Sequence, residues 1–458
     1  MAIIKPSLPK GTRDFSPLQM DRRNFIFDTI RAVFKKYGYR QIETPSMENL
    51  STLTGKYGDE GDKLIFKILN SGDYLADVND EMLHEKNSAK LSSEIAEKAL
   101  RYDLTVPFAR YVVSHQNDIS FPFKRYQIQP VWRADRPQRG RYREFYQCDA
   151  DVVGSDSLLN EAEFVMIYHE ALKNLGLKDF TIKINNRKIL AGIADLLNRP
   201  ELIIDMTVAI DKMDKIGIEG VSKELLENGF SSKEIETLIP VLELKGTNAA
   251  KLSELSIILS NSETGLKGIA ELKTVFDLVE KLKPENELVS LELDLSLARG
   301  LNYYTGAIFE VKSNEVRMGS IGGGGRYDDL TGMFGLKNIS GVGISFGADR
   351  IYDVMDELNL FAEAVKGGTE VLIINFGNES QDYGIKILKL LRDKDIPSEI
   401  YPNKAKVQKQ MKYADDNAIS YVIFAGDEEQ KQNSATLKTM SSGEQQILPL
   451  SDLLTFLS

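Results

Sequence analysis

The chain has 458 residues, of which 42% are hydrophobic and 27% charged, a composition typical of globular proteins with roughly two to four domains. Its net charge of −11 argues against a surface that is basic throughout, although a local basic patch still acts over a screening length of about 8 Å. Because Cys148 is the one cysteine, an intrachain disulfide is excluded. The three histidines are scattered, which disfavours a transition-metal site. No apolar run has the roughly 18 residues of a membrane helix.

The N-terminal third alternates helical and strand patterns. Apolar residues recur at helical spacing over residues 17–37 and predict an amphipathic helix that Gly38 ends. Residues 39–50 predict a strand interrupted by Pro45. Residues 121–154 predict a β-hairpin, with strands KRYQIQPVWR and RYREFYQCDADVV around the turn ADRPQRG. The first residues lack the apolar core of a secretory signal, so we expect a cytoplasmic protein.

The sequence pattern changes twice in the rest of the chain. Residues 190–285 contain short Leu/Ile-faced helices with exposed Lys and Glu, which indicates a helical insertion. Strand patterns return at 289–311 and 341–347. After the linker-like VKGGTE, the pattern βαβαβ predicts a separate small α/β domain. We therefore expect a larger domain at 1–366 and a smaller one at 367–458.

The segment RADRPQRGRYREFYQ carries five arginines in fifteen residues. Strand alternation would place Arg141 and Arg143 on one face with Gln147, Asp149 and Asp151. A solvated surface strand shows the same pattern, but these polar residues have apolar neighbours and should then need partners. Because guanidinium matches phosphate oxygens, the arginines favour a polyphosphate ligand, and the acids favour a cationic or hydrogen-bonding group further along.

Two glycine stretches and two single arginines also stand out. SIGGGGRYDDL lacks the ending of a phosphate loop, and GVGISFG places its third glycine one residue too late for a dinucleotide fingerprint, so both indicate close packing or room for a ligand. Arg350 falls in the first turn of a predicted helix, where a cation is unfavourable without an anion to hold. Arg299 stands alone in an apolar run, either paired with a carboxylate or held as a cation in a dry pocket.

Several of these segments resemble one known family. FKRYQIQPVWRADRPQRGRYREFYQCDADVVG, GVGISFGADRI and YGYRQIETPSMENL resemble motifs 2, 3 and 1 of the class II aminoacyl-tRNA synthetases. LARGLNYYTG, GGGGRYDDL, LRYDLTVPFARY and PKGTRDFSP are similar to signatures of the histidyl-tRNA synthetase family. These segments occur in family order over nearly the whole chain. Two stretches, RGRYREFYQCDAD and LRYDLTVPFARY, resemble the sequences of the eukaryotic-type branch. Such sequences also occur in bacteria.

The resemblance implies a fold and an activity. The fold is an α+β catalytic domain, an antiparallel sheet flanked by helices, with a helical insertion and a C-terminal mixed α/β anticodon-binding domain. The activity is ligation of L-histidine to tRNA(His) with ATP and Mg²⁺ through a histidyl-adenylate, in a homodimer built on motif 1. No protein ligand for Mg²⁺ is indicated. KAKVQKQMK suggests a tRNA phosphate contact or an ordinary solvated helix face, and its lysines are Lys404, Lys406, Lys409 and Lys412.

The resemblance also implies roles for single residues. Arg133 matches the arginine that holds the ATP α-phosphate, Arg141 a loop arginine near ATP, and Arg350 the arginine at the γ-phosphate. Arg299 matches the arginine that stabilises charge on the α-phosphate during transfer, so Arg299 and Arg133 are the expected catalytic residues. The positions that match the histidine pocket are Asp103, Thr105, Gln147, Asp151, Tyr303, Tyr304 and Tyr327.

Three positions depart from the family pattern. Asp103 and Asp151 are glutamates in much of the bacterial branch, and Asn302 stands where aspartate is usual. Two alternatives to the ligase also stay open. One is a regulatory subunit of histidine biosynthesis that resembles the catalytic domain, and the other is a different enzyme that forms an acyl-adenylate. The C-terminal domain and Arg299 argue against the first, and the histidine signatures argue against the second.

Overall fold

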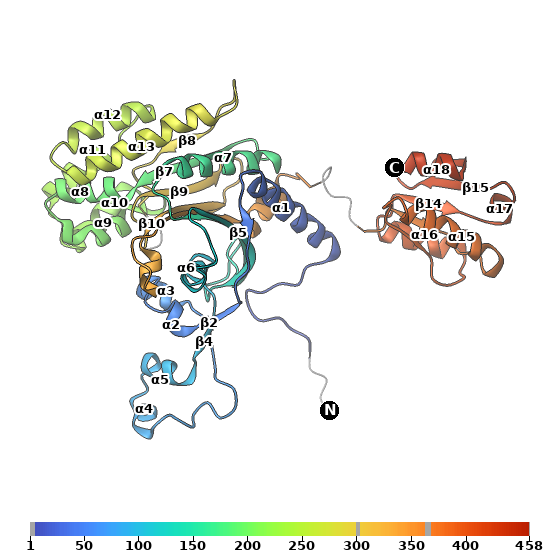
Figure 1. Ribbon diagram of the computed structural model, residues 1–458, viewed down its shortest axis with the longest axis horizontal. Helices are drawn as coiled ribbons and strands as arrows, with labels where there is room; N and C mark the ends of the chain where they lie inside the picture. The colour runs from blue at the N-terminus through green and yellow to red at the C-terminus, as the bar shows by residue number, and fades with distance from the viewer. Residues whose placement is uncertain (1–4, 299–302, 362–367, 458) are drawn as a thin grey trace. The chain divides into compact units, whose positions relative to one another are not determined.

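The chain forms two compact units, and the computed structural model describes residues 5–298, 303–361 and 368–457 (Figure 1). The larger unit comprises residues 1–14 and 23–360, and the smaller comprises 15–22 and 361–458. Within the described ranges, none of the helices has the length and apolarity needed to cross a membrane.

The larger unit is built on an eight-stranded sheet. Its strands are β1 (Arg40–Gln41), β5 (Phe123–Trp132), β6 (Glu144–Val153), β7 (Phe180–Asn186), β8 (Leu291–Leu293), β9 (Ala307–Ser313), β10 (Gly322–Asp328) and β11 (Ser340–Gly347). They lie in the order β1-β5-β6-β11-β10-β9-β7-β8. The β1–β5 and β7–β8 pairs are parallel, and the other neighbours are antiparallel. The predicted antiparallel architecture is therefore confirmed.

Helices cover the apolar face of this sheet. The predicted N-terminal helix is present as α1 (Pro17–Lys36), and α7 (Leu159–Asn174) packs against β11. The rings of Phe34 on α1 and Tyr168 on α7 both lie against Phe346, with centroids 5.8 and 4.7 Å away. Because side chains alternate along a strand, the opposite face is left to the polar residues of β6.

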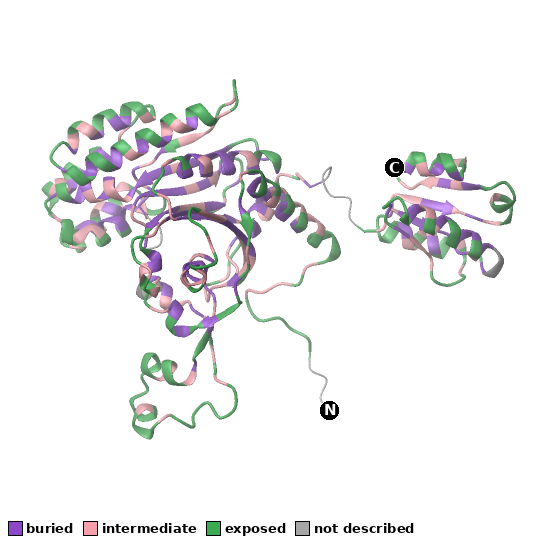
Figure 2. Ribbon diagram, viewed as in Figure 1, coloured by how far each residue is buried: buried purple, intermediate pink, exposed green. Residues whose placement is uncertain are grey.

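The predicted strand at 39–50 is divided between two sheets. Residues on one side of Pro45 form β1, and those on the other form β2 (Met47–Asn49) in a three-stranded sheet with β4 (Lys98–Leu100) and β3 (Lys67–Ile68). The helices of this region are α2 (Leu50–Leu53), α3 (Gly58–Lys63), α4 (Asp80–Glu85), α5 (Ser88–Ile95) and α6 (Thr105–Ser114). No described residue of α4 or α5 is buried, and the two helices project from the unit (Figure 2). The sequence did not predict this projection.

The predicted insertion is helical. It contains α8 (Arg187–Leu196), the 3-10 helix η1 (Pro200–Leu202), α9 (Ile203–Ile210), α10 (Met213–Glu227), α11 (Ser232–Leu242), α12 (Asn248–Ile258) and α13 (Glu263–Leu282). The first and last of these helices cross closely, because a Cβ on Gly192 would lie 2.6 Å from the Cα of Gly265. Two further helices complete the larger unit: η2 (Leu330–Phe334) and α14 (Ala348–Glu357).

Two expectations for the sheet need correction, and one strand was not predicted. The second hairpin strand begins at Glu144, so Arg141 and Arg143 belong to the preceding loop rather than to the polar face of β6. The glycine run at 322–325 is the start of β10, a central strand that side-chain patterning could not reveal because glycine has no side chain. The strand pattern at 289–311 corresponds to two separate strands, β8 and β9.

The smaller unit has its own mixed sheet. Its elements are β12 (Val371–Ile373), α15 (Asn378–Arg392), β13 (Ser398–Ile400), α16 (Val407–Asp416), β14 (Tyr421–Phe424), α17 (Asp427–Lys431), β15 (Ser434–Thr439), β16 (Gln445–Pro449) and α18 (Leu450–Leu457). The strand order is β13-β12-β14-β15-β16, parallel among the first three and antiparallel among the rest. The predicted βαβαβ pattern is present, followed by α17, the β15–β16 hairpin and α18, which were not predicted. Buried Val371, Leu391 and Leu453 belong to its core.

Candidate active site

The polar face of the large sheet forms the floor of a cavity of about 310 Å³. Neighbouring strands place Gln127, Asp149 and Ser345 in one row across β5, β6 and β11. The row continues onto β10 with Gly323, which has no side chain to fill the space. A polar floor with a glycine gap therefore leaves room for a ligand above the sheet.

Three arginines converge at one end of this cavity. Arg133, Arg141 and Arg350 all line it, although they come from the hairpin loop and from the first turn of α14. The Arg133 guanidinium packs 4.3 Å from the Tyr102 ring centre and donates from Nε to the Tyr102 carbonyl at 3.0 Å. Burial lowers the pKa of Arg350, and the nearby charges of Arg141 and Arg133 lower it further. Such mutual repulsion favours an anion between the three side chains.

Backbone carbonyls hold Arg350 in place. Its Nε donates to the Gly140 carbonyl at 2.7 Å, and one terminal nitrogen donates to the Ser320 carbonyl at 2.6 Å. The adjacent carboxylate, Asp349, is engaged by Arg13 and Arg23. The cluster near Arg350 therefore keeps its excess positive charge, which suits a polyphosphate.

Beside the cavity lies a buried cluster of acids and tyrosines, here called the acid–tyrosine wall, which meets the cavity at Tyr304. Asp151 on β6 accepts a 2.6 Å hydrogen bond from the Tyr327 hydroxyl of β10 and forms a 2.6 Å ion pair with Arg125 of β5. Asp103 accepts from the hydroxyls of Tyr57 at 2.9 Å and Tyr303 at 3.4 Å. Burial raises the pKa of both carboxyl groups, so a cationic ligand group would stabilise their charged forms.

Glycines on β11 leave the space that the Asp151 and Tyr327 side chains occupy. A Cβ on Gly343 would lie 2.0 Å from Asp151 Oδ1, and one on Gly341 would lie 2.3 Å from the Tyr327 ring. Tyr304 covers Gly325 in the same way, since a Cβ there would meet its ring at 2.9 Å. The acid–tyrosine wall can therefore form only with glycine at these positions.

Asp149 is a third buried carboxyl on this floor. It is 2% exposed, and burial raises its pKa to about 7 even though Arg125 acts in the opposite direction. Its Oδ1 atom has no hydrogen-bond partner among the described residues, and neither do Oε1 of Gln127 and Oε1 of Gln147. Three unpaired acceptors at one site suit a ligand that brings N–H donors.

Comparisons with known proteins agree with this geometry. A family model described as histidyl-tRNA synthetase matches residues 92–351, and one described as an anticodon binding domain matches residues 370–458. The chain belongs to the histidyl-tRNA synthetase family. The histidine–tRNA ligases of Christiangramia forsetii and Bacteroides fragilis are 59% and 58% identical to it, over 98% of each chain. The crystal structure of histidyl-tRNA synthetase from a species of Nostoc superimposes with a TM-score of 0.85, at 32% identity and 99% coverage of both chains.

These bacterial relatives do not support the expected eukaryotic-type branch. They do account for the helical insertion and the C-terminal domain as parts of one family, because the match spans nearly the whole chain.

The structure gathers most of the residues that the sequence singled out. Arg133, Arg141, Arg350, Gln147 and Tyr304 line one cavity. Tyr303 joins the other aromatic residues, with its ring centre 5.0 Å from Tyr304 and 6.0 Å from Tyr327. Thr105 begins α6.

The remaining predicted residues lie elsewhere. Arg299 and Asn302 lie outside the described residues. The lysines at 404, 406, 409 and 412 are exposed in the smaller unit, on α16 and the segment before it. Among them, Lys412 pairs with Asp416 at 2.9 Å.

Two site residues were not singled out from the sequence. Arg125 lies on the polar face of the hairpin, and strand alternation applied to both strands would have paired it with Asp151. Tyr57 comes from α3's N-cap, and no sequence signal connects it with Asp103. Such contacts depend on register and tertiary packing.

The described residues form no preformed metal centre. Within these ranges, no three His, Cys, Asp or Glu side chains are grouped as metal ligands. Of the two carboxylates that line the cavity, Asp349 is engaged by arginines, and Asp135 lies 3.8 Å from Arg141. A cation would therefore depend on oxygens that a ligand brings, as Mg²⁺ bound to phosphates does.

Proposed function

We propose that the chain is a histidine–tRNA ligase, which joins L-histidine to tRNA(His) with ATP through a histidyl-adenylate and releases AMP and pyrophosphate. The observation that carries the proposal is the convergence of Arg133, Arg141 and Arg350 on one cavity next to an acid–tyrosine wall. One face of the sheet thus has an anion site and, next to it, hydrogen-bond acceptors for the N–H groups of a ligand. This arrangement fits a triphosphate and an amino acid bound side by side.

The first step needs no nucleophile from the protein. The histidine carboxylate attacks the α-phosphorus of ATP, and pyrophosphate leaves. The chain then contributes position and stabilisation of negative charge, which explains a site of arginines. By family resemblance, Arg133 and Arg299 act at the α-phosphate, Arg350 at the γ-phosphate, and Arg141 near the nucleotide.

The acid–tyrosine wall would hold the amino acid. We assign histidine binding to Asp103, Thr105, Gln147, Asp151, Tyr303, Tyr304 and Tyr327. Carboxylates and amide oxygens accept hydrogen bonds from the α-ammonium group and the ring nitrogens of the substrate. A buried polar pocket rejects analogues that leave its groups unpaired by roughly 10⁴–10⁵, so an editing site is unnecessary.

In the second step the terminal adenosine hydroxyl of tRNA attacks the adenylate. The smaller unit would bind the anticodon, since its sequence matches an anticodon-binding family. We infer that Lys404, Lys406, Lys409 and Lys412 contact tRNA phosphates. Their exposure supports this inference, and the pairing of Lys412 with Asp416 makes Lys412 the weakest of the four.

Mg²⁺ would enter with ATP. When bound, it would neutralise phosphate charge, and the chain's residues would need to supply only one or two carboxylates. The available carboxylates do not identify its ligands, so we assign none.

Three broader features belong to the proposal. The domains are the catalytic one at 1–366, with its insertion at about 190–285, and the anticodon-binding one at 367–458. Motif 1, which contains β1 at the edge of the large sheet, would build a homodimer. The enzyme would act in the cytoplasm, where tRNA is charged.

Pyrophosphate exchange with each of the twenty amino acids tests the function. We expect ATP–pyrophosphate exchange with histidine alone, followed by charging of tRNA(His) in a separate assay. Exchange with another amino acid would identify a different adenylate-forming enzyme. Histidine binding without any exchange would instead support the regulatory-subunit alternative.

A further inference from the structure

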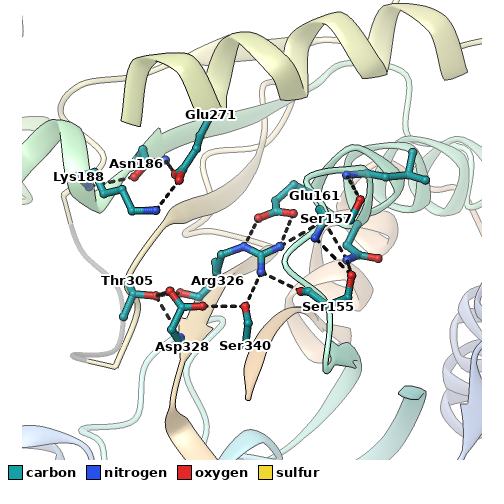
Figure 3. A network of polar contacts seen from close by, with 12 residues as sticks. Ser155, Ser157, Glu161, Asn186, Lys188, Glu271, Thr305, Arg326, Asp328 and Ser340 are labelled. Carbon is teal, nitrogen blue, oxygen red and sulfur yellow. Dashed lines mark hydrogen bonds and ion pairs between the residues drawn. The ribbon is translucent and has the colours of Figure 1, made fainter. Parts of the chain in front are cut away.

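A hydroxyl–carboxylate pair holds residues 303–306 against β10. The Thr305 hydroxyl donates to Asp328 Oδ2 at 2.7 Å and accepts from the Asp328 backbone N–H at 3.0 Å (Figure 3). The Thr305 backbone N–H donates to the Arg326 carbonyl at 2.8 Å. Thr305 therefore fastens its segment to β10 by side chain and backbone together.

The carboxylate of Asp328 is itself fixed by a network that ends in a buried ion pair. Its Oδ1 accepts from the Ser340 hydroxyl at 2.7 Å, and Ser340 accepts from Arg326 at 2.7 Å. Arg326 also forms a two-point ion pair with Glu161 of α7, and both side chains are at least 95% buried (Figure 3). These bonds hold the Asp328 carboxylate in place, so that its Oδ2 atom can accept the hydrogen bond from Thr305.

The fastened segment carries two residues of the pocket wall. Tyr303 donates to Asp103, and Tyr304 lines the arginine cavity. Both directly precede Thr305, so a displacement of Thr305 moves their backbone. Arg187 holds the residue that follows Thr305, because its backbone N–H donates to the Gly306 carbonyl at 2.8 Å, and its side chain donates to the Ala298 carbonyl at 3.0 Å.

We propose that Thr305 and Asp328 form a positioning latch, which sets where Tyr303 and Tyr304 stand in the histidine pocket. The proposal rests on the proposed function. Neither latch residue lines the cavity, so the latch would act through the two tyrosines rather than by touching the substrate. Removing the Thr305 hydroxyl does not leave a buried carboxylate unpaired, because Asp328 is exposed.

Thr305→Val tests the latch, since valine keeps the shape and removes the hydroxyl. We expect KM for histidine in pyrophosphate exchange to rise about tenfold, the scale of one charge-assisted hydrogen bond. KM for ATP should stay unchanged, because Arg133, Arg141 and Arg350 are held by other contacts. Thr305→Ser keeps the hydroxyl and should restore the wild-type KM for histidine.

A double-mutant cycle identifies the partner. Asp328→Asn weakens the same bond, so Thr305→Val added to Asp328→Asn should cost much less than it costs in the wild type. Thr436→Val is the matched control, because Thr436 makes the same kind of bond to Glu429, at 2.8 Å, in the smaller unit. It should leave both KM values unchanged.

The outcomes separate the latch from the function. An unchanged KM for histidine in Thr305→Val, additive effects in the cycle, or an equal rise in both KM values would overturn the latch. If the wild-type chain shows no histidine-dependent exchange, the proposed function fails instead.

Discussion

At the scale of single residues, the site depends on charges that are buried without full compensation. Asp149 shows this most clearly. Its carboxyl is enclosed by Arg125, Asp151 and Ser345, and burial raises its pKa to about 7. The unfolded chain would release the same proton near its ordinary value of about 3.9. Between these two values the folded state binds more protons than the unfolded state.

The first prediction follows from that difference. The free energy of unfolding should fall as pH rises from about 4 to 7, by at most about 1.4 kcal/mol per pH unit from this group. Asp149→Asn has no proton to lose, so its stability relative to wild type should increase over this window and level off above it. Urea denaturation from pH 4.5 to 8 measures the effect.

Asp77→Asn serves as the control for Asp149→Asn, because Asp77 is exposed in the same unit. Its stability relative to wild type should show little change with pH. A constant difference between Asp149→Asn and wild type would show that Asp149 is charged throughout the range.

Residue chemistry alone identified part of this site. The charge of Arg350 in a helix's first turn predicted an anion partner, and the structure places it with two other arginines. Arg125 could not be assigned in the same way, since its partnership with Asp151 depends on the register of two strands. The kind of partner that a single residue needs could be predicted from its chemistry. A contact between residues of two different strands could be identified only from the fold.

At the scale of elements, glycine strands shape the pocket. Side-chain periodicity predicted α1 and β6, because their apolar residues repeat every 3.6 or 2 positions. It could not predict β10, whose first four residues are glycine, or the projecting α4 and α5, which have no buried face. These three elements were therefore missed because they lack an apolar pattern.

Gly343→Ala gives the second prediction. Its methyl group would lie 2.0 Å from Asp151 Oδ1, so the carboxylate must move and lose Tyr327 or Arg125. We expect kcat/KM for histidine to fall about tenfold to hundredfold, the range for overpacking a buried site. Steady-state pyrophosphate exchange measures it.

Gly347→Ala is the comparison on the same strand. Its methyl group would meet the nearest atom, the Ile321 carbonyl oxygen, at 3.5 Å, an ordinary contact. The loss should be clearly smaller than for Gly343→Ala. Equal losses in both variants would mean that strand flexibility, rather than the space beside Asp151, decides activity.

The third prediction concerns α16 and the segment before it. Replacing Lys404, Lys406, Lys409 and Lys412 by alanine should weaken tRNA binding and flatten its salt dependence, because fewer counterions are released. Histidine-dependent pyrophosphate exchange should not change. Filter binding from 50 to 200 mM salt provides the test, and unchanged binding would identify the run as an ordinary solvated surface.

At the scale of the whole molecule, each unit has its own sheet and its own core. A chain that ends at residue 367 should therefore retain histidine-dependent pyrophosphate exchange while it loses tRNA charging. Parallel exchange and charging assays distinguish the two steps. If exchange is lost and circular dichroism shows the shortened chain to be folded, the smaller unit must contribute to the first step.

The expected homodimer is also tested at this scale. Light scattering of the purified chain should give twice its mass of 51.4 kDa. A measured mass equal to that of one chain would contradict the proposal that motif 1 builds a homodimer.

The lone cysteine has a practical consequence. Cys148 is fully buried, and burial raises the pKa of its thiol, so maleimide reagents should leave it untouched. Two cysteines introduced on the surface, one in each unit, would then take up donor and acceptor dyes without any other residue being altered. Fluorescence energy transfer within such a doubly labelled chain would follow the distance between the units as tRNA arrives and departs.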